Sequence, residues 1–209
     1  AHFPTDLFLV MRERDNVCKY MDIALQHISD NMLQLMRRQV SKKDTYRLIE
    51  QFRKEVPGIH LRTTLMVGHP GETEEDYLLT RQAVEQVQFD NAFIFRYSPR
   101  RGTPAAAMEN QIPEEVKQDR QAELMELQQE ISLERGESCV GKDYLVMIEG
   151  KVADENAYVG RTYADAPGID GYMFINTGEL LMSGDFVKAH VTGSLEYDLI
   201  AEIADEYTE

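Results

Sequence analysis

The sequence predicts an α/β domain with a parallel sheet, followed by a small all-β, OB-like barrel. Strand-length apolar runs alternate with amphipathic helical patterns in the first part, which is typical of parallel sheets. Short strand-like segments separated by Gly, Asn and Asp follow. The charge changes at the same place, because residues 1–138 carry 18 basic and 23 acidic side chains and residues 139–209 carry 4 and 14. We therefore expect two domains, 1–138 and 139–209.

The first domain is expected to begin its regular pattern with a strand over residues 17–25. Ser29 then starts a short helix, because a serine side chain accepts a hydrogen bond from the free N–H groups of a first turn. A second helix begins at Ser41 with Asp44 three positions later, the spacing of a capping pair. It ends before Pro57, which cannot continue a helix.

The pattern then repeats. A strand is predicted over residues 61–67, and Thr73 with Asp76 caps the next helix. A third strand over 91–97 precedes a long helix over 113–133. Three parallel strands are few for a complete sheet or barrel, so we expect this chain to be part of a longer protein. The strands of the second domain are expected over residues 144–152, 158–161, 171–175, 185–192 and 199–203.

The amino-acid composition disfavours several classes of function. The chain has 22 Lys and Arg against 37 Asp and Glu, a net charge of −15, which disfavours direct nucleic-acid binding because phosphate contacts need clustered cations. No apolar run approaches the roughly 18 residues of a membrane helix, and no signal peptide is evident. Cys18 and Cys139 lie far apart, with Cys18 expected inside a strand as a small core residue. We expect a soluble, cytoplasmic protein.

Ligands of parallel α/β folds lie beyond the carboxyl ends of the strands, so those residues are the candidates. Gln26 and His27 end the first strand, where they can bind a ligand or cap the following helix. Arg62, within an apolar strand, needs a carboxylate of either the protein or a ligand. Residues 68–71 (GHPG) form either an anion-binding loop before a helix or a tight turn.

The third strand ends in aromatic and basic residues. Phe95 is expected in the core, which is the commoner position for a barrel phenylalanine. Arg96, Arg100 and Arg101 form either a site for a phosphate or acidic substrate, or a solvated loop. The histidines and cysteines show no H-x-x-x-H or C-x-x-C spacing, and no G-x-S-x-G is present, so neither a metal site nor a serine nucleophile is indicated.

Longer motifs are more specific than these single residues. They cover residues 20–30 (YMDIALQHISD), 36–38 (MRR), 61–64 (LRTT), 68–73 (GHPGET), 97–99 (YSP) and 102–103 (GT). As a set they resemble the radical S-adenosylmethionine (radical SAM) methylthiotransferases, and the second domain resembles the TRAM domain that ends those enzymes. The resemblance implies the C-terminal half of a radical-SAM (β/α) partial TIM barrel, followed by a small OB-like TRAM barrel.

Within the family, this chain most closely resembles the members that modify a ribosomal protein. Residues 160–171 and 197–199 carry this resemblance. The acidic second domain agrees with this, because it would attract a basic ribosomal protein and repel RNA. Residues 97–104 (YSPRRGTP), however, resemble the tRNA adenosine methylthiotransferases equally well. These tRNA enzymes are the alternative, and a non-catalytic protein-binding module is the alternative from another class.

The resemblance implies a reaction and its cofactors. A 4Fe-4S cluster reduces S-adenosylmethionine to a 5′-deoxyadenosyl radical, which abstracts a hydrogen from the β-carbon of an aspartate on the twelfth ribosomal protein of the small subunit. A methylthio group is then added. The family binds its two 4Fe-4S clusters through a CxxxCxxC loop and an N-terminal domain, and two separated cysteines cannot replace them. We therefore expect this chain alone to be inactive.

The resemblance also implies the residues that contact S-adenosylmethionine. Gln26 and Thr64 correspond to positions that contact its ribose or methionine part. Arg62 is a carboxylate partner, and Met66 and Tyr97 border the adenine. No residue of this chain is expected to be catalytic or to bind a metal. The expected partner is a basic ribosomal protein of the small subunit, bound through the acidic TRAM domain.

Overall fold

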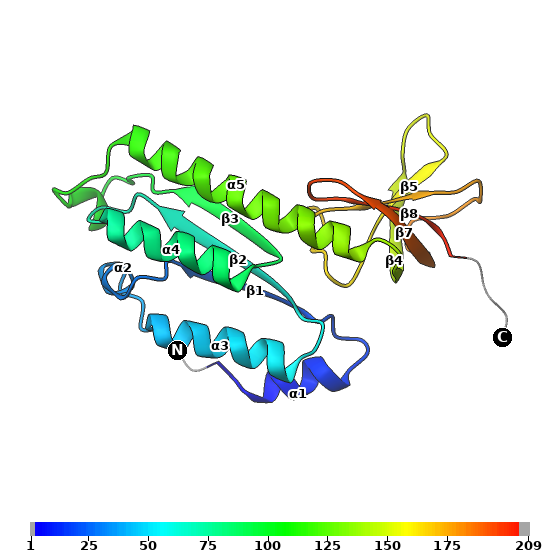
Figure 1. Ribbon diagram of the computed structural model, residues 1–209, viewed down its shortest axis with the longest axis horizontal. Coiled ribbons are helices and arrows are strands. Elements are labelled where there is room, and N and C mark those ends of the chain that lie inside the picture. The colour runs from blue at the N-terminus through cyan, green and yellow to red at the C-terminus, as the bar shows by residue number, and fades with distance from the viewer. Residues whose placement is uncertain (1–2, 205–209) are drawn as a thin grey trace. The chain divides into compact units, whose positions relative to one another are not determined.

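The structure is a computed structural model in which residues 3–204 are described (Figure 1). The chain divides into two compact units, residues 1–128 and 129–209. The division falls inside the long helix α5, which runs without a break over Glu114–Cys139. The domain boundary at residues 138/139 that the change in charge and periodicity indicates stays a prediction.

The first unit alternates strands and helices, as the sequence predicts. Its three strands form one parallel sheet in the order β1-β2-β3. An N-terminal helix, α1, was not expected; its Phe8 ring packs edge-on against Phe52 with ring centroids 4.9 Å apart. The elements are α1 (Asp6–Glu13), β1 (Tyr20–Gln26), α2 (Asp30–Leu35), α3 (Lys42–Glu55), β2 (His60–Val67), α4 (Glu74–Val87), β3 (Asn91–Arg96), a short 3-10 helix (Ala105–Ala107) and α5.

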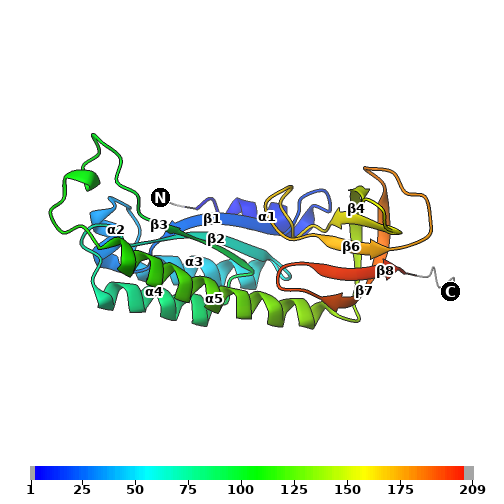
Figure 2. The same ribbon diagram turned by 90° about the horizontal axis from the view of Figure 1, so that it is seen from above.

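The two faces of the sheet differ, and β2 shows this most clearly. Its alternate residues Leu61, Thr63, Leu65 and Val67 are buried, whereas the residues between them are only half-buried. The helices α3 and α4 lie on the same side of the sheet (Figure 2). Because side chains alternate across a strand, the half-buried set, which includes Arg62, Thr64 and Met66, lies on the opposite side. We call this side the open face.

Side-chain caps fix the starts of three helices in the first unit. Ser29, Ser41 and Thr73 each accept a hydrogen bond from a first-turn N–H, as predicted. Asp76 completes a capping box with Thr73 and also accepts hydrogen bonds from the Ser29 hydroxyl and the Asn31 amide. Burial raises the pKa of Asp76, but these hydrogen bonds outweigh it and hold the pKa below its usual value. Asp76 thus joins the starts of α2 and α4.

The second unit contains the closed barrel that the sequence predicts. Its order is β4-β5-β6-β8-β7, in which only the β6–β8 pair is parallel. Gly160 lies where the wall is tightly packed: a Cβ added there would be 2.6 Å from Val146 Cγ1 and 2.8 Å from the Met147 carbonyl oxygen. The strands are β4 (Asp143–Lys151), β5 (Ala157–Arg161), β6 (Met173–Asn176), β7 (Phe186–Ser194) and β8 (Leu199–Ile203).

Cys18 differs from its prediction. It is exposed and precedes β1, which begins at Tyr20, so it is not a core residue within a strand. The apolar run that predicted an earlier strand start instead packs through Val17 at the edge of the core formed with α1. Both cysteines are free. Among residues 3–204, no helix combines the length and the apolar character that crossing a membrane requires.

Gly160→Ala is expected to destabilise the barrel by about 1–3 kcal/mol, because the added methyl group clashes with β4 backbone that cannot move without breaking its pairing. Hydrogen–deuterium exchange of β4 and β5 amides should accelerate by about tenfold or more. Gly178→Ala is the control, since a Cβ there meets no atom within 4 Å. Equal exchange in the two variants would contradict the tight packing at Gly160.

Asp76→Asn is expected to lower the free energy of unfolding at pH 7 by about 1–3 kcal/mol, because the capping carboxylate is lost. The folded-state pKa of Asp76 is depressed, so its contribution is present above the unfolded pKa of about 3.9 and is lost as the pH falls through the folded value. Urea unfolding should therefore show the gap between wild type and variant shrinking from pH 7 to pH 3. Glu75→Gln, exposed on the same turn, should leave stability nearly unchanged. A gap that does not change with pH would contradict a depressed pKa.

Candidate functional site

The open face of the sheet carries three of the predicted site residues in one row. Arg62, Thr64 and Met66 alternate along β2 and are all half-buried. Arg62 forms an ion pair with Asp22 of β1, and its guanidinium lies 4.3 Å from the centre of the Phe93 ring of β3. Of the two partners that the sequence left open for Arg62, the structure supplies the protein carboxylate. Contact of Arg62 with a cofactor stays a prediction.

Phe95 is not in the core, contrary to the prediction. Its side chain is 51% exposed, and it stacks on Phe93 with ring centroids 6.5 Å apart. Ile94, between them, is the buried residue of β3. The alternation of β3 therefore directs both phenylalanines to the open face, where they offer flat apolar surface to a ligand.

Gln26 has an unusual backbone conformation at the end of β1. Its φ of 67° lies in the left-handed region, which non-glycine residues rarely adopt. The pairing of β1 with β2 also shifts register between Ile23 and Gln26. Such strained positions cluster at functional sites, so the conformation supports Gln26 as a binding residue.

Tyr97 directly follows β3 and is buried. Its ring lies edge-on to the His69 ring at 5.2 Å, and Lys117 Nζ lies 5.5 Å from its centre. Among the described residues, its phenolic oxygen finds no hydrogen-bond partner. A buried hydroxyl without a partner is costly, and a polar atom of a ligand would satisfy it.

Two N–H groups of the turn after β2 donate to other groups of the protein. The N–H of Gly68 donates to the Glu72 carboxylate, and the N–H of Gly71 donates to the Asn110 carbonyl at 2.9 Å. Gly68 has a φ of 73°, and a Cβ there would overlap the Lys117 side chain. Of the two interpretations that the sequence allowed, the structure therefore matches a tight turn that packs under α5.

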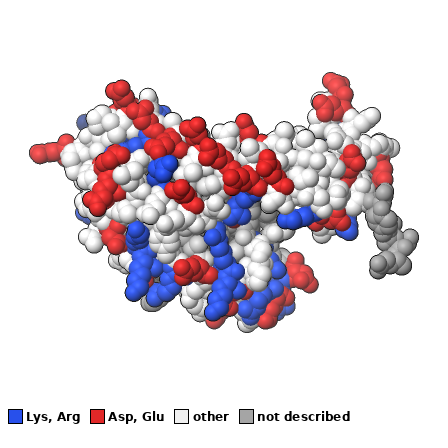
Figure 3. Space-filling view, in the orientation of Figure 1, with Lys and Arg blue, Asp and Glu red and all other residues white. Residues whose placement is uncertain are grey.

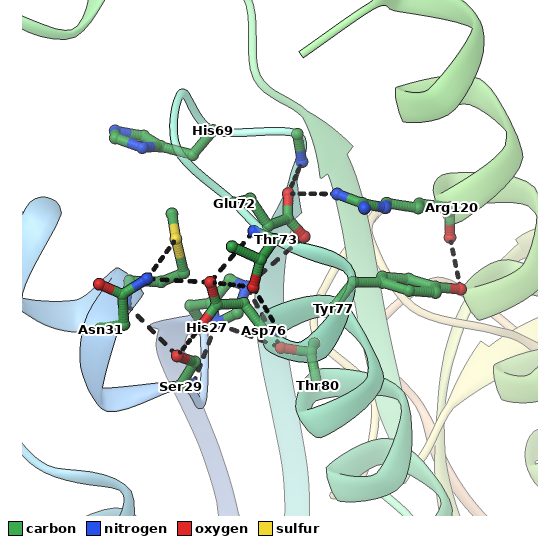
Figure 4. Close-up of polar contacts among 12 residues, drawn as sticks. His27, Ser29, Asn31, His69, Glu72, Thr73, Asp76, Tyr77, Thr80 and Arg120 are labelled. Atoms are coloured by element: carbon green, nitrogen blue, oxygen red, sulfur yellow. Dashed lines mark hydrogen bonds and ion pairs between the residues drawn. The ribbon is translucent and has the colours of Figure 1, made fainter. Parts of the chain in front are cut away.

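A buried polar cluster, which the sequence did not predict, lies behind this turn (Figure 4). Glu72 is fully buried, with Oε1 3.6 Å from His27 Nε2 and Oε2 3.5 Å from an Arg120 nitrogen. His27 Nδ1 accepts the Ser29 N–H at 3.0 Å, so His27 helps to start α2, one of its two predicted roles. Burial lowers the pKa of the nearby His69. The sequence feature that could have indicated this cluster is Glu72, an ionisable residue directly before the Thr73 cap.

The three basic residues at and after the end of β3 differ in their surroundings. Arg96 pairs with Glu114 at 3.0 Å, whereas Arg100 and Arg101 are exposed on the loop after β3. Across residues 3–204, no three His, Cys, Asp or Glu side chains come together in an arrangement that could hold a metal ion.

The residues at the carboxyl ends of the strands suit a ligand with both polar and flat apolar parts. The half-buried Gln26 and Thr64 provide hydrogen-bonding groups, Phe93 and Phe95 provide ring surface, and Tyr97 provides the hydroxyl without a partner. S-adenosylmethionine has these chemical features, so the donor set fits it.

Comparison with known families agrees with the motifs. The family described as the Radical SAM superfamily matches residues 5–84, and the TRAM domain matches residues 140–204. The first match covers β1, β2 and most of α4, and the second covers the whole closed barrel.

Several curated relatives share one name, ribosomal protein uS12 methylthiotransferase RimO. The Bacteroides thetaiotaomicron protein is 58% identical over 99% of this chain and 48% of its own length. The Bacteroides fragilis protein is 59% identical over 97% of this chain and 47% of its own length, and that of Porphyromonas gingivalis is 50% identical over 98% and 48%. The chain thus spans about half the length of the curated relatives it matches.

A solved structure shares the fold. Escherichia coli coproporphyrinogen III oxidase (HemN), described as a radical SAM enzyme, has a TM-score of 0.53 and 12% identity, over 78% of this chain and 44% of its own. One segment of the chain therefore matches the radical SAM superfamily and another matches the TRAM domain, and the resemblance of its motifs to the radical SAM methylthiotransferases is confirmed.

Proposed function

We propose that this chain is part of a radical SAM methylthiotransferase that adds a methylthio group to the β-carbon of an aspartate on ribosomal protein uS12. The observation that carries the proposal is the 58% identity, over 99% of the chain, to a relative named for this activity. The two-unit arrangement of partial sheet and closed barrel supports it.

Within this proposal, five residues hold S-adenosylmethionine. Gln26 and Thr64 bind its ribose or methionine part. Arg62 is a carboxylate partner, and Met66 and Tyr97 border the adenine. The chemistry that this group supplies when bound is hydrogen-atom abstraction from the substrate. The chain's own task is to position it, and the Asp22–Arg62 pair and the packed turn at Gly68 keep that surface rigid.

The two 4Fe-4S clusters that the reaction requires must be held by other residues. Each cluster needs several cysteine thiolates, and this sequence has only Cys18 and Cys139. Residues outside this sequence therefore complete the active site in our proposal, and this chain alone is expected to be inactive.

The proposed partner is a basic ribosomal protein, bound through the acidic second domain. Residues 139–209 carry 4 basic and 14 acidic side chains, of which Asp205, Glu206 and Glu209 lie outside the described residues. Acidic side chains also gather over α5 in the first unit, whereas basic ones gather over α3 (Figure 3). A ribosomal partner implies a cytoplasmic location. The exposed Arg100 and Arg101 favour tRNA as the second candidate substrate.

A chimera tests the proposed reaction. It joins this chain to the part of the Bacteroides thetaiotaomicron relative that the chain does not match, since the match covers 48% of that protein. After reconstitution with iron and sulfide, we expect mass spectrometry to find a methylthio group on the uS12 aspartate and none on tRNA. The relative itself is the positive control. A methylthio group on a tRNA adenosine, with unmodified uS12, would replace the proposed substrate by the second candidate.

Tyr97→Phe is expected to have opposite effects on folding and on cofactor binding. Removing a buried hydroxyl without a partner should leave the stability of this chain unchanged or raise it by about 1 kcal/mol in urea unfolding. In the chimera, calorimetry should show S-adenosylmethionine binding weakened by about tenfold, because the ligand loses a hydrogen bond. Gln26→Ala should weaken binding as well. Unchanged affinity in both variants would remove these residues from the site.

A further inference from the structure

An apolar patch lies on the outside of the barrel in the second unit. Leu145 of β4 and Phe186 of β7 are each 64% exposed. The two strands are neighbours: Phe186 pairs with Met147, and Leu145 with Lys188, so Leu145 and Phe186 are diagonal neighbours on the outer surface. Met182, 73% exposed, and Leu180, 92% exposed, lie on the loop that leads into β7. Leu145 and Phe186 are called the β4–β7 patch below.

The loop that carries Leu180 and Met182 has a defined structure. The N–H of Leu181 donates to the Tyr158 hydroxyl at 3.2 Å, and the N–H of Met182 donates to the Asp185 carboxylate at 2.8 Å. The N–H of Gly184 donates to the Ile148 carbonyl at 2.8 Å, which ties the loop to β4. The chain that leads into Phe186 is therefore fixed to the barrel, which lowers the entropy cost of binding a partner at the β4–β7 patch.

Exposed apolar side chains that are neighbours on one surface mark interaction sites. The charged residues near the β4–β7 patch are mixed: Glu149 of β4 pairs with Arg161 at 2.8 Å, and Lys188, opposite Leu145, pairs with Asp143 at 2.9 Å. Over the whole second domain, however, acidic residues are in excess. The excess of acidic residues over residues 139–209 repels RNA, an anionic membrane and a second copy of this chain. Charge complementarity thus leaves a cationic protein as the favoured occupant.

We propose that the β4–β7 patch is the anchor of a docking surface for a cationic protein segment with an apolar side chain at its centre. This inference rests on the proposed function, where that protein is uS12, and it assigns the binding energy to particular residues. Anchors of this kind dominate affinity when a polar rim surrounds them. The acidic excess of residues 139–209 contributes chiefly to the rate of association and to its dependence on salt.

The test measures binding of purified uS12 to the full chain by calorimetry. Phe186→Ser and Leu145→Ser should each weaken binding by about tenfold or more, at both low and high salt, since the anchor is apolar. Both side chains are largely exposed, so the variants are expected to fold, which far-ultraviolet circular dichroism checks.

Ile169→Ser is the matched control. Ile169 is also exposed, at 53%, but its loop adjoins the turn between β7 and β8, because the N–H of Tyr172 donates to Asp198 at 2.8 Å. The turn between β7 and β8 follows Ser194, the last residue of β7, whereas Phe186 is the first residue of β7. The control should bind uS12 like the wild type.

Three outcomes would overturn the inference. The first is unchanged uS12 affinity in both patch variants; the proposed function then stands if the chimera still modifies uS12. The second is no binding of uS12 by the wild-type chain, in which case the chimera's activity decides the proposed function separately. The third is that the patch variants lose tRNA binding, or a dimer seen by light scattering, while keeping uS12 affinity.

Discussion

The first unit depends on the buried carboxylate of Glu72. Glu72 is fully buried behind the turn that follows β2, and it is held by the Gly68 N–H, by His27 and by Arg120. A charge in such a position is tolerated only if its surroundings neutralise it, and losing one partner is strongly destabilising. The groups that neutralise it come from the end of β1, the end of β2 and helix α5. One requirement of electrostatics therefore determines how three elements meet beside the open face.

The sequence predicted the local features well because they follow from local chemistry. The caps at Ser29, Ser41 and Thr73 depend on residues within one turn of each other, and the structure contains all three. The five strands of the barrel likewise follow from short apolar runs between turn residues. Phe95 was placed wrongly because alternation shows that a strand has two faces but not which face the helices cover. The Glu72 cluster was missed because residues 27, 72 and 120 meet only in the folded chain.

The candidate site likewise combines features that the local sequence predicts with features that only the fold determines. Its row of Arg62, Thr64 and Met66 follows from alternation along one strand, and the need of Arg62 for a carboxylate follows from its apolar surroundings. The identity of that carboxylate, Asp22, depends on the register between β1 and β2, which no local pattern encodes. The left-handed conformation of Gln26 is equally hidden, because glutamine does not favour it and only the fold imposes it.

The position of β8 between β6 and β7 has a consequence for the order in which the barrel forms during synthesis. The strand Leu199–Ile203 lies between β6 and β7, and it is the last strand of the barrel to leave the ribosome. Until it emerges, β6 and β7 each keep an unpaired edge, which is the kind of surface that adds strands from other chains. The nascent barrel therefore stays open until its final strand arrives, and chaperones that shield strand edges would act on it during that interval.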